Sequence, residues 1–338
     1  MVAPLTDAPA PPAAAPARRR GRRDRLRTLT GRDRIVATVM LGVPLLVVAA
    51  FIWLPTVASI FLSFTKWTGV GSVQLKSCAD LPSAPGIPQP GCLNGVQNYH
   101  QAFTTYPDFW PAVQHNAIWL LVFIVIATPL GMLFAVIIDR GIRGSRIYQS
   151  LLFLPVMLSL ALIGIIWELI YAPNLGLINT VIGHNQNDNL IDWLGNPRLN
   201  LWALLVEATW RQAGYVMVLY LAGLKAVDPS LREAATVDGA TGWQTFWRVV
   251  FPAMRPINIV VLVVTVIESL RAFDLVYITS GGNPLHGLEL LSVAVTQNIV
   301  GETQRIGFGS TLGVILLVIS LVPITIFLQQ AFRREDQR

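Results

Sequence analysis

Charged side chains lie inside two stretches of the sequence, 199–224 and 257–278, that are otherwise apolar. Charge in apolar surroundings is costly, and it is usually kept because it has a function. The same side chains are also spaced to form ion pairs along a helix, in which case their role is structural. The possible pairs are Arg211 with Glu207, and Arg271 with Glu268 or Asp274. Both interpretations stay open for Arg211 and Glu268, whereas the structural one is favoured for Arg271 and Asp274.

Residue patterns for enzymatic chemistry are missing from the sequence. The four histidines are scattered, and neither His-Glu-x-x-His nor Gly-x-Ser-x-Gly occurs. The phosphate-binding pattern Gly-x4-Gly-Lys-Ser/Thr is also absent, so the chain has no such loop to cradle ATP. The sequence therefore predicts a chain that is not an enzyme and that binds no metal or cofactor itself. A membrane-embedded enzyme stays a disfavoured alternative.

Composition indicates a membrane protein. Of the 338 residues, 53% are hydrophobic and 13% are charged, whereas a soluble domain carries about a quarter charged residues. Four runs without Asp, Glu, Lys or Arg are each long enough to span a bilayer, which takes about 20 apolar residues. Together with the two interrupted stretches, they predict an all-α polytopic protein with six transmembrane helices. The four runs are Ile35–Thr65, Phe109–Ile138, Ile147–Trp167 and Ile306–Phe332.

The basic residues are unevenly distributed. Nine arginines fall within residues 18–34, directly before the first apolar run. Such a run can bind nucleic acid, or it can bind the anionic lipid headgroups beside a membrane helix. Because an apolar run follows directly, we expect it to bind membrane lipids and not nucleic acid. Because Lys and Arg collect on the cytoplasmic side, their distribution predicts that both termini are cytoplasmic. We expect residues 1–34 to be a disordered arm rich in Ala, Pro and Arg, and residues 35–335 to be the transmembrane domain.

The longest connection outside the membrane covers residues 66–107 and contains both cysteines, Cys78 and Cys92. On the oxidising side of a membrane such a pair is expected to form a disulfide. A free, buried pair is the alternative.

The connection between the fourth and fifth predicted helices, residues 226–256, has the pattern of a helix-turn-helix. Asp228 and Pro229 suit a helix start, and Gly239 suits a helix end in the left-handed conformation. Thr241 and Gln244 have the spacing of a capping box, and Pro252 is expected to end the second helix. The residues alone leave open whether the apolar face of that helix docks on a partner or lies on lipid headgroups. This face consists of Trp243, Phe246, Trp247 and Val250.

The same loop resembles a known motif. Glu233-Ala234-Ala235, Gly239 and, ten residues later, Val249-x-Phe251-Pro252 are similar to the pattern E-A-A-x3-G-x9-I-x-L-P. That pattern is typical of inner-membrane permease subunits of binding-protein-dependent ABC importers. The resemblance implies that this loop is the coupling helix region, which sits in a cleft of the ATP-binding subunit. The coupling residues it implies are Glu233, Ala234, Ala235, Asp238, Gly239, Phe246 and Pro252.

A second segment, residues 271–284, narrows the class. Its sequence RAFDLVYITSGGNP resembles a segment of sugar permeases of the maltose and glycerol-phosphate type, with Asn283 where glycine is commoner. The resemblance covers about residues 35–335. It implies a multi-pass subunit of the bacterial inner membrane that imports a sugar, such as a di- or oligosaccharide, by alternating access. An ion-driven carrier is disfavoured, because no internal repeat is seen.

The resemblance also implies partners and a substrate site. The partners are a second homologous permease subunit, a dimer of ATP-binding subunits that holds ATP and Mg, and an extracytoplasmic sugar-binding protein. In the maltose-type family the sugar contacts come from the helices before and after the coupling loop. Here one face of each helix offers hydrogen-bonding groups, and the first helix also offers an aromatic ring, Tyr215 or Trp210. The substrate residues this implies are Arg211, Gln212, Tyr215, Thr265, Glu268 and Ser269.

Overall fold

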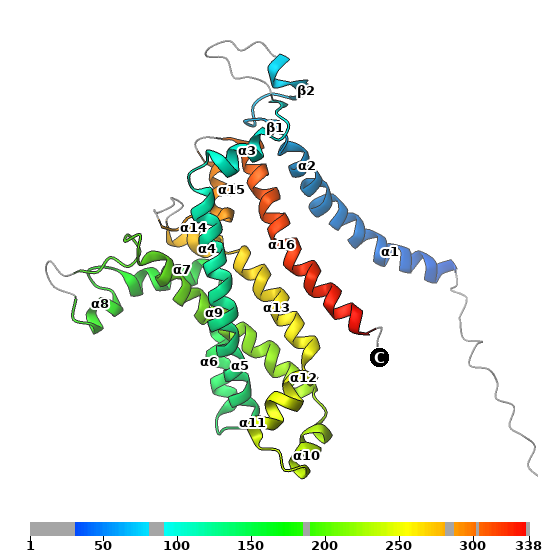
Figure 1. Cartoon of the computed structure of the whole chain (residues 1–338), viewed down its shortest axis with the longest axis vertical. Helices are drawn as coiled ribbons and strands as arrows, with labels where there is room; N and C mark the ends of the chain where they lie inside the picture. Colours follow the sequence, from blue (N-terminus) through cyan, green and yellow to red (C-terminus); the bar gives the residue numbers. More distant parts are fainter. Residues whose placement is uncertain (1–30, 81–90, 185–189, 281–286, 302–303, 336–338) are drawn as a thin grey trace, which may run out of the picture. The chain divides into compact units, whose positions relative to one another are not determined.

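The computed structural model describes residues 31–80, 91–184, 190–280, 287–301 and 304–335. Residues 1–30 of the predicted disordered arm lie outside the described residues, and residues 31–34 form the start of the first helix, which begins at Gly31. The chain forms two compact units, Met1–Pro55 and Thr56–Arg338. In the first unit, helix α1 (Gly31–Val48) continues directly into the π-helix η1 (Ala49–Trp53) (Figure 1).

Helices dominate the second unit as well (Figure 1). Helix α2 begins at Leu54, the last residue but one of the first unit, and continues into the second. The α-helices of this part are α2 (Leu54–Leu62), α3 (Gln97–Thr104), α4 (Phe109–Val122), α5 (Thr128–Asp139), α6 (Ser145–Met157), α7 (Leu160–Tyr171), α8 (Leu177–Val181), α9 (Asn200–Ala226), α10 (Pro229–Val237), α11 (Gly242–Thr245), α12 (Phe251–Ala253), α13 (Arg255–Leu270), α14 (Asp274–Thr279), α15 (Leu291–Val300) and α16 (Ile306–Glu335). The π-helices are η3 (Phe123–Ala127) and η5 (Phe246–Val250), and η2 (Cys78–Asp80) is a 3-10 turn.

Three helices within the described part of the chain are long and apolar enough to cross a membrane. They are Ile35–Leu62, Phe109–Asp139 and Ile306–Ile326, and they match the first, second and sixth predicted spans. A fourth is reached if the bent pair α6 and α7 counts as one span. The structure therefore agrees with a mostly helical membrane protein, and six spans remain a prediction.

The third predicted span is not one continuous helix. The apolar run Ile147–Trp167 is divided between α6 and α7, which are bent by 101°. Leu158 and Ser159 are both extended there, and the Ser159 hydroxyl caps α7 by accepting from the Leu162 N–H at 3.2 Å. The expectation of a single helix was wrong because a capping serine starts a new helix even within an apolar run.

The stretch predicted as the fifth span is also interrupted. It consists of α13 and α14, which are separated at Arg271–Phe273. The apolar helix α15 was not predicted at all. It is too short to span a bilayer, with 10 residues, and it packs along α16.

The outer loop contains a small sheet, which corrects the all-α prediction. Its strands are β1 (Thr65–Lys66), β2 (Val73–Ser77) and β3 (Gly91–Leu93), in the order β1-β3-β2. Strand β3 runs antiparallel to β1, with Thr65 opposite Leu93, and parallel to β2.

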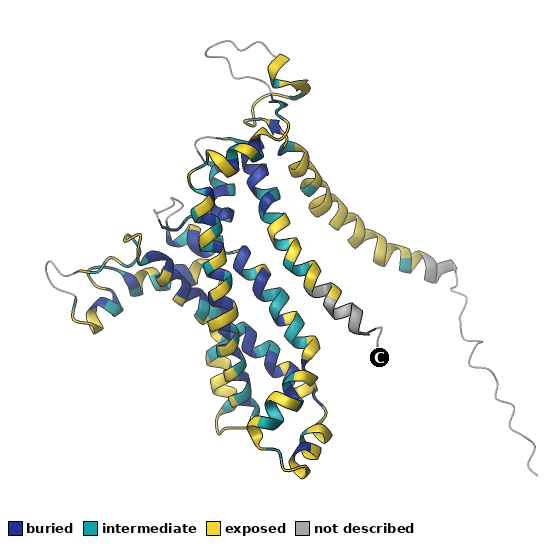
Figure 2. Ribbon diagram, in the orientation of Figure 1, coloured by how far each residue is buried: buried dark blue, intermediate teal, exposed yellow. Residues whose placement is uncertain are grey.

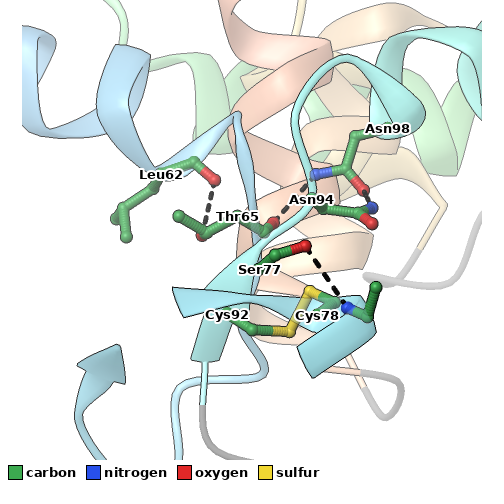
Figure 3. Close-up of a disulfide and its surroundings, with 8 residues drawn as sticks. Leu62, Thr65, Ser77, Cys78, Cys92, Asn94 and Asn98 are labelled. Atoms are coloured by element: carbon green, nitrogen blue, oxygen red, sulfur yellow. Dashed lines mark hydrogen bonds between the residues drawn. A yellow bond between two sulfur atoms is a disulfide. The ribbon is translucent and has the colours of Figure 1, made fainter. Parts of the chain in front are cut away.

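A disulfide joins this sheet to the turn η2. The bond connects Cys78 and Cys92, as the sequence led us to expect, and it is shown in Figure 3. Next to it, the buried Asn98 side chain donates hydrogen bonds to the carbonyl oxygens of Ser63, at 2.9 Å, and Thr65, at 2.8 Å. Asn98 thus connects α3 to Ser63, which follows α2, and to the first residue of β1.

Helix α9 lies at the centre of the packing in the second unit. It contributes to two of the three hydrophobic clusters, one with α4, α7 and α14 and the other with α5, η5 and α13. In Figure 2 its ribbon is largely buried. The third cluster joins α3, α4, α15 and α16.

Glycines let α9 and its neighbours approach closely. A Cβ added to Gly131 of α5 would lie 2.7 Å from Cβ of Val216 and 2.8 Å from the carbonyl oxygen of Ala213, both on α9. In α9 itself, Gly214 faces the carbonyl oxygen of Leu152 of α6 in the same way. Small residues at such contacts are typical of membrane helix pairs.

We predict that Gly131→Ala destabilises the protein by separating α5 from α9. Overpacking of this kind costs about 1–3 kcal/mol. The thermal unfolding midpoint of the purified protein in detergent should fall. Gly313→Ala is the matched control, because the added carbon would meet only Cγ1 of Val295 at 4.0 Å. Equal midpoints for the two variants would contradict the close contact.

Candidate functional site

Arg211 and Glu268 come together between α9 and α13. Nη1 of Arg211 lies 3.4 Å from Oε2 of Glu268, and the two side chains are 26% and 30% exposed. The two charged side chains therefore pair between α9 and α13, which are separated in the sequence by residues 227–254. The intrahelical pair of Arg211 with Glu207, one of the two interpretations of the sequence, is not formed.

Aromatic side chains surround this ion pair. Trp119 of α4, Phe123 of η3 and Phe273 line a small cavity beside Arg211 and Glu268. The cavity measures about 40 Å³, which is room for a water molecule and not for a sugar ring. Trp119 and Phe123 were missed in the sequence, where aromatic residues in an apolar run give no sign of facing a cavity.

The other four residues assigned to the substrate lie elsewhere on the two helices. Gln212, Thr265 and Ser269 are buried. The hydroxyl of Ser269 is used locally, since it donates to the carbonyl oxygen of Val266 at 2.9 Å. Tyr215 is half-buried and does not line this cavity. The structure thus brings together Arg211 and Glu268 alone of the six.

Glu207 is fully buried in α9, one turn from Arg211. Neither of its carboxylate oxygens has a hydrogen-bond partner among the described residues. In the same helix, the ring of Trp210 lies 5.9 Å from that of Trp167 of α7, which in turn lies 5.2 Å from the ring of Tyr171, measured between ring centroids.

The connection 226–256 forms the predicted helix-turn-helix at the end of α9, and we call residues 226–256 the hairpin. Asp228 caps α10 by accepting from the Ser230 N–H at 2.9 Å, and this hydrogen bond holds the pKa of the Asp228 carboxyl below its usual value. The capping box is present, because Thr241 and Gln244 each accept from the other's backbone N–H. Both helix starts predicted from the sequence are therefore confirmed.

The motif residues of the hairpin are mostly accessible. Glu233, Ala234, Asp238 and Gly239 are exposed, whereas Ala235 is buried. Gly239 has a φ of +77°, and a Cβ added there would meet nothing within 4 Å. The first helix and its end thus leave backbone and side chains accessible at the surface of this chain.

The second half of the hairpin differs from the prediction. After α11 the chain continues as the π-helix η5 and then as α12, so Pro252 lies within a helix and does not end one. The helix ends at Ala253 instead, and Met254 separates it from α13, which begins at Arg255. The apolar face is graded, because Trp243 is 72% exposed while Val250 is buried. Phe246 lies between them and is half-buried.

An ion cluster that the sequence did not indicate lies at the base of the hairpin. Asp139, the last residue of α5, has one oxygen 2.9 Å from Nζ of Lys225 and the other 2.9 Å from Nη1 of Arg232. Arg232 also donates to the carbonyl oxygen of Leu224 at 3.0 Å. These residues come from three helices, α5, α9 and α10, and their approach depends on tertiary structure.

Comparison with known proteins identifies the family. Residues 127–335 match the family described as binding-protein-dependent transport system inner membrane component. The chain is 30% identical to an osmoprotective compounds uptake permease protein, GgtC, of Synechocystis sp., over 87% of this chain and 97% of that protein. It is 28% identical to the xylose/arabinose import permease protein XacH of Haloferax volcanii, over 93% of each.

A solved structure has the same fold. A bacterial ABC transporter involved in the import of the acidic polysaccharide alginate matches with a TM-score of 0.70 and 19% identity. The match covers 89% of this chain and 96% of that chain. The resemblance seen in the hairpin motif is therefore confirmed over most of the sequence. The chain belongs to the family of binding-protein-dependent transport system inner membrane components, and it is a non-catalytic permease subunit of an ABC importer.

Proposed function

We propose that this permease moves a sugar, such as a di- or oligosaccharide, into the cytoplasm by alternating access. The observation that carries the proposal is the Arg211–Glu268 pair beside Trp119, Phe123 and Phe273. Charged hydrogen-bonding groups next to aromatic rings suit a ligand with hydroxyl groups and apolar ring faces. A relative named for xylose and arabinose import supports the same substrate class.

The position of the pair along α9 supports a translocation site. Arg211 lies 15 residues before the end of α9 at Ala226, or about 22 Å along the helix axis. The hydrocarbon core of a bilayer is about 30 Å thick. With the hairpin in the cytoplasm, the pair lies inside the membrane, where unpaired charge is costly and paired charge marks a path for ligands.

In the assembly we propose, six helices cross the bacterial inner membrane, with both termini cytoplasmic. The distribution of Lys and Arg supports this orientation. The partners are a second, similar permease subunit, an extracytoplasmic sugar-binding protein and two ATP-binding subunits that hold ATP and Mg. The cavity beside Arg211 and Glu268 is too small for a sugar. In this proposal the sugar site is completed by the second permease subunit and by opening of the helices.

The hairpin is the part of the chain that we propose to dock on the ATP-binding subunits. Its exposed Glu233 and its open turn at Gly239 support docking, because a partner can reach both. Ala234, Ala235, Asp238, Phe246 and Pro252 complete the contact or shape it. Closure of the nucleotide-binding partners then displaces the hairpin and, with it, the helices on either side.

We predict that Arg211→Gln and Glu268→Gln each reduce sugar transport by the complete complex about tenfold or more. Each change removes hydrogen bonds from a charged group, which are worth about 1.5–3 kcal/mol each. Uptake into proteoliposomes that contain the binding protein and ATP measures the effect. Glu168→Gln is the control, because Glu168 is exposed on α7 and lies outside the cavity. Unchanged uptake in both site variants would show that these residues are not part of the substrate path.

We predict that Gly239→Val abolishes coupling while the protein still inserts. A β-branched residue is strained at a φ of +77°, whereas asparagine tolerates this conformation. Gly239→Asn is therefore the matched control and should retain most of the transport. Co-purification of the ATP-binding subunits and ATP-dependent uptake are the measurements.

We predict that Glu233→Lys weakens association with the ATP-binding subunits. The exposed carboxylate offers a contact for a basic group, and reversal of its charge replaces attraction by repulsion. Glu233→Gln removes the charge without reversal and should have a smaller effect on co-purification. Wild-type association and uptake with Glu233→Lys would rule out this contact.

A further inference from the structure

Asp139 connects three helices through its two carboxylate oxygens. It closes α5, and it receives Lys225 from the last turn of α9 and Arg232 from α10, each at 2.9 Å. Its side chain is only 10% exposed, whereas those of Arg232 and Lys225 are 37% and 66% exposed. The carboxylate is thus the enclosed centre of the cluster, and the two cations reach it from outside.

Arg232 is the more important of the two cations. Its guanidinium binds Asp139 with one nitrogen and the carbonyl oxygen of Leu224 with another, at 2.9 and 3.0 Å. A planar group with several donors can hold two acceptors in a fixed geometry, which an ammonium group cannot. Lys225 is largely exposed, and exposed ion pairs contribute little. The position of α10 relative to α5 and α9 therefore depends chiefly on Arg232.

The packing beside this cluster is open. A cavity of about 490 Å³ lies between the hairpin and the ends of α5 and α9. Asp139 and Arg232 line it, together with Thr236, Ala240 and Phe246. Beside this cavity, the ion pair of Arg232 with Asp139 provides a direct contact between α10 and α5.

Helix α5 leads from this cluster to the candidate substrate site. The helix Phe109–Asp139 is continuous through α4, η3 and α5. Phe123, which lines the cavity beside Arg211 and Glu268, lies 16 residues before Asp139, or about 24 Å along the axis. The π-helix η3 begins at the same residue. A force applied at Asp139 thus acts on the helix that forms one wall of the site.

We propose that Asp139 and Arg232 form a strut that passes displacement of the hairpin to helix α5, so that ATP hydrolysis is coupled to opening of the substrate site. Asp139 is a positioning residue in this account, since it acts through Arg232 by holding α10 against the end of α5. The proposal rests on the proposed function of the chain as a sugar permease, and it adds a route to α5 beside the covalent connections of the hairpin to α9 and α13.

The test uses the complete complex in proteoliposomes and measures sugar uptake and ATP hydrolysis in the same sample. Asp139→Asn and Arg232→Gln should each lower the amount of sugar moved per ATP hydrolysed about tenfold, while the ATP-binding subunits still co-purify. The double variant should fall no further than the single variants, because both remove the same contact. Asp139→Glu keeps the charge and should restore much of the ratio, and Lys225→Gln should lower it only slightly.

Arg140→Gln is the matched control, because Arg140 lines the same cavity and is not ion-paired within the described part of the chain. A wild-type ratio of transport to hydrolysis in Asp139→Asn and Arg232→Gln would overturn the strut. A double variant whose loss in sugar moved per ATP equals the two single losses combined would overturn it too, because Asp139 and Arg232 would then act independently. If the wild-type complex itself moved no sugar, the proposed function would fail, which is distinct from failure of the strut.

Discussion

The cost of charge in apolar surroundings shapes this protein more than any other constraint. A charged group inside a membrane helix is stable only when it is paired or solvated. Arg211 of α9 is paired with Glu268 in this way, and Asp139 at the end of α5 is paired with two cations. Glu207 of α9 is the exception, because it is buried and its carboxylate has no hydrogen-bond partner among the described residues. The contacts of Arg211 and Asp139 join helices that are far apart in the sequence, so the few charges also specify which helices lie together.

Helix α9 is the element on which these contacts converge. It carries Arg211 in its middle and Lys225 in its last turn, and it continues into the hairpin. Gly131 and Gly214 allow α5 and α6 to pack closely against it. Such close contacts make relative movement of the helices collective, because a dense interior transmits displacement. The hairpin and the candidate substrate site are therefore connected through one continuous helix, α9, and through its neighbour α5.

Local signals in the sequence predicted the hairpin well. The caps at Asp228 and Thr241 are formed as expected, because a capping bond involves residues only two or three positions apart. Hydropathy did not predict the points at which a helix breaks within an apolar stretch. Ser159 starts a new helix within an apolar run, and the turn at Arg271–Phe273 divides α13 from α14. The strands around Cys92 were missed because they are too short to show a period.

What the sequence by itself determined is the class of the protein: a helical membrane chain whose hairpin motif belongs to a permease. Hydropathy and capping act along the chain, so they can be read without the fold. Only the tertiary structure decided which charges pair. From the sequence, Glu207 on the same helix was a possible partner of Arg211, but in the structure Arg211 pairs with Glu268 of α13. The fold likewise brought Asp139 to Arg232, 93 positions away. Pairing of this kind depends on the distances between packed helices. A carboxylate on the same helix is therefore not more favoured as a partner than one on a neighbouring helix.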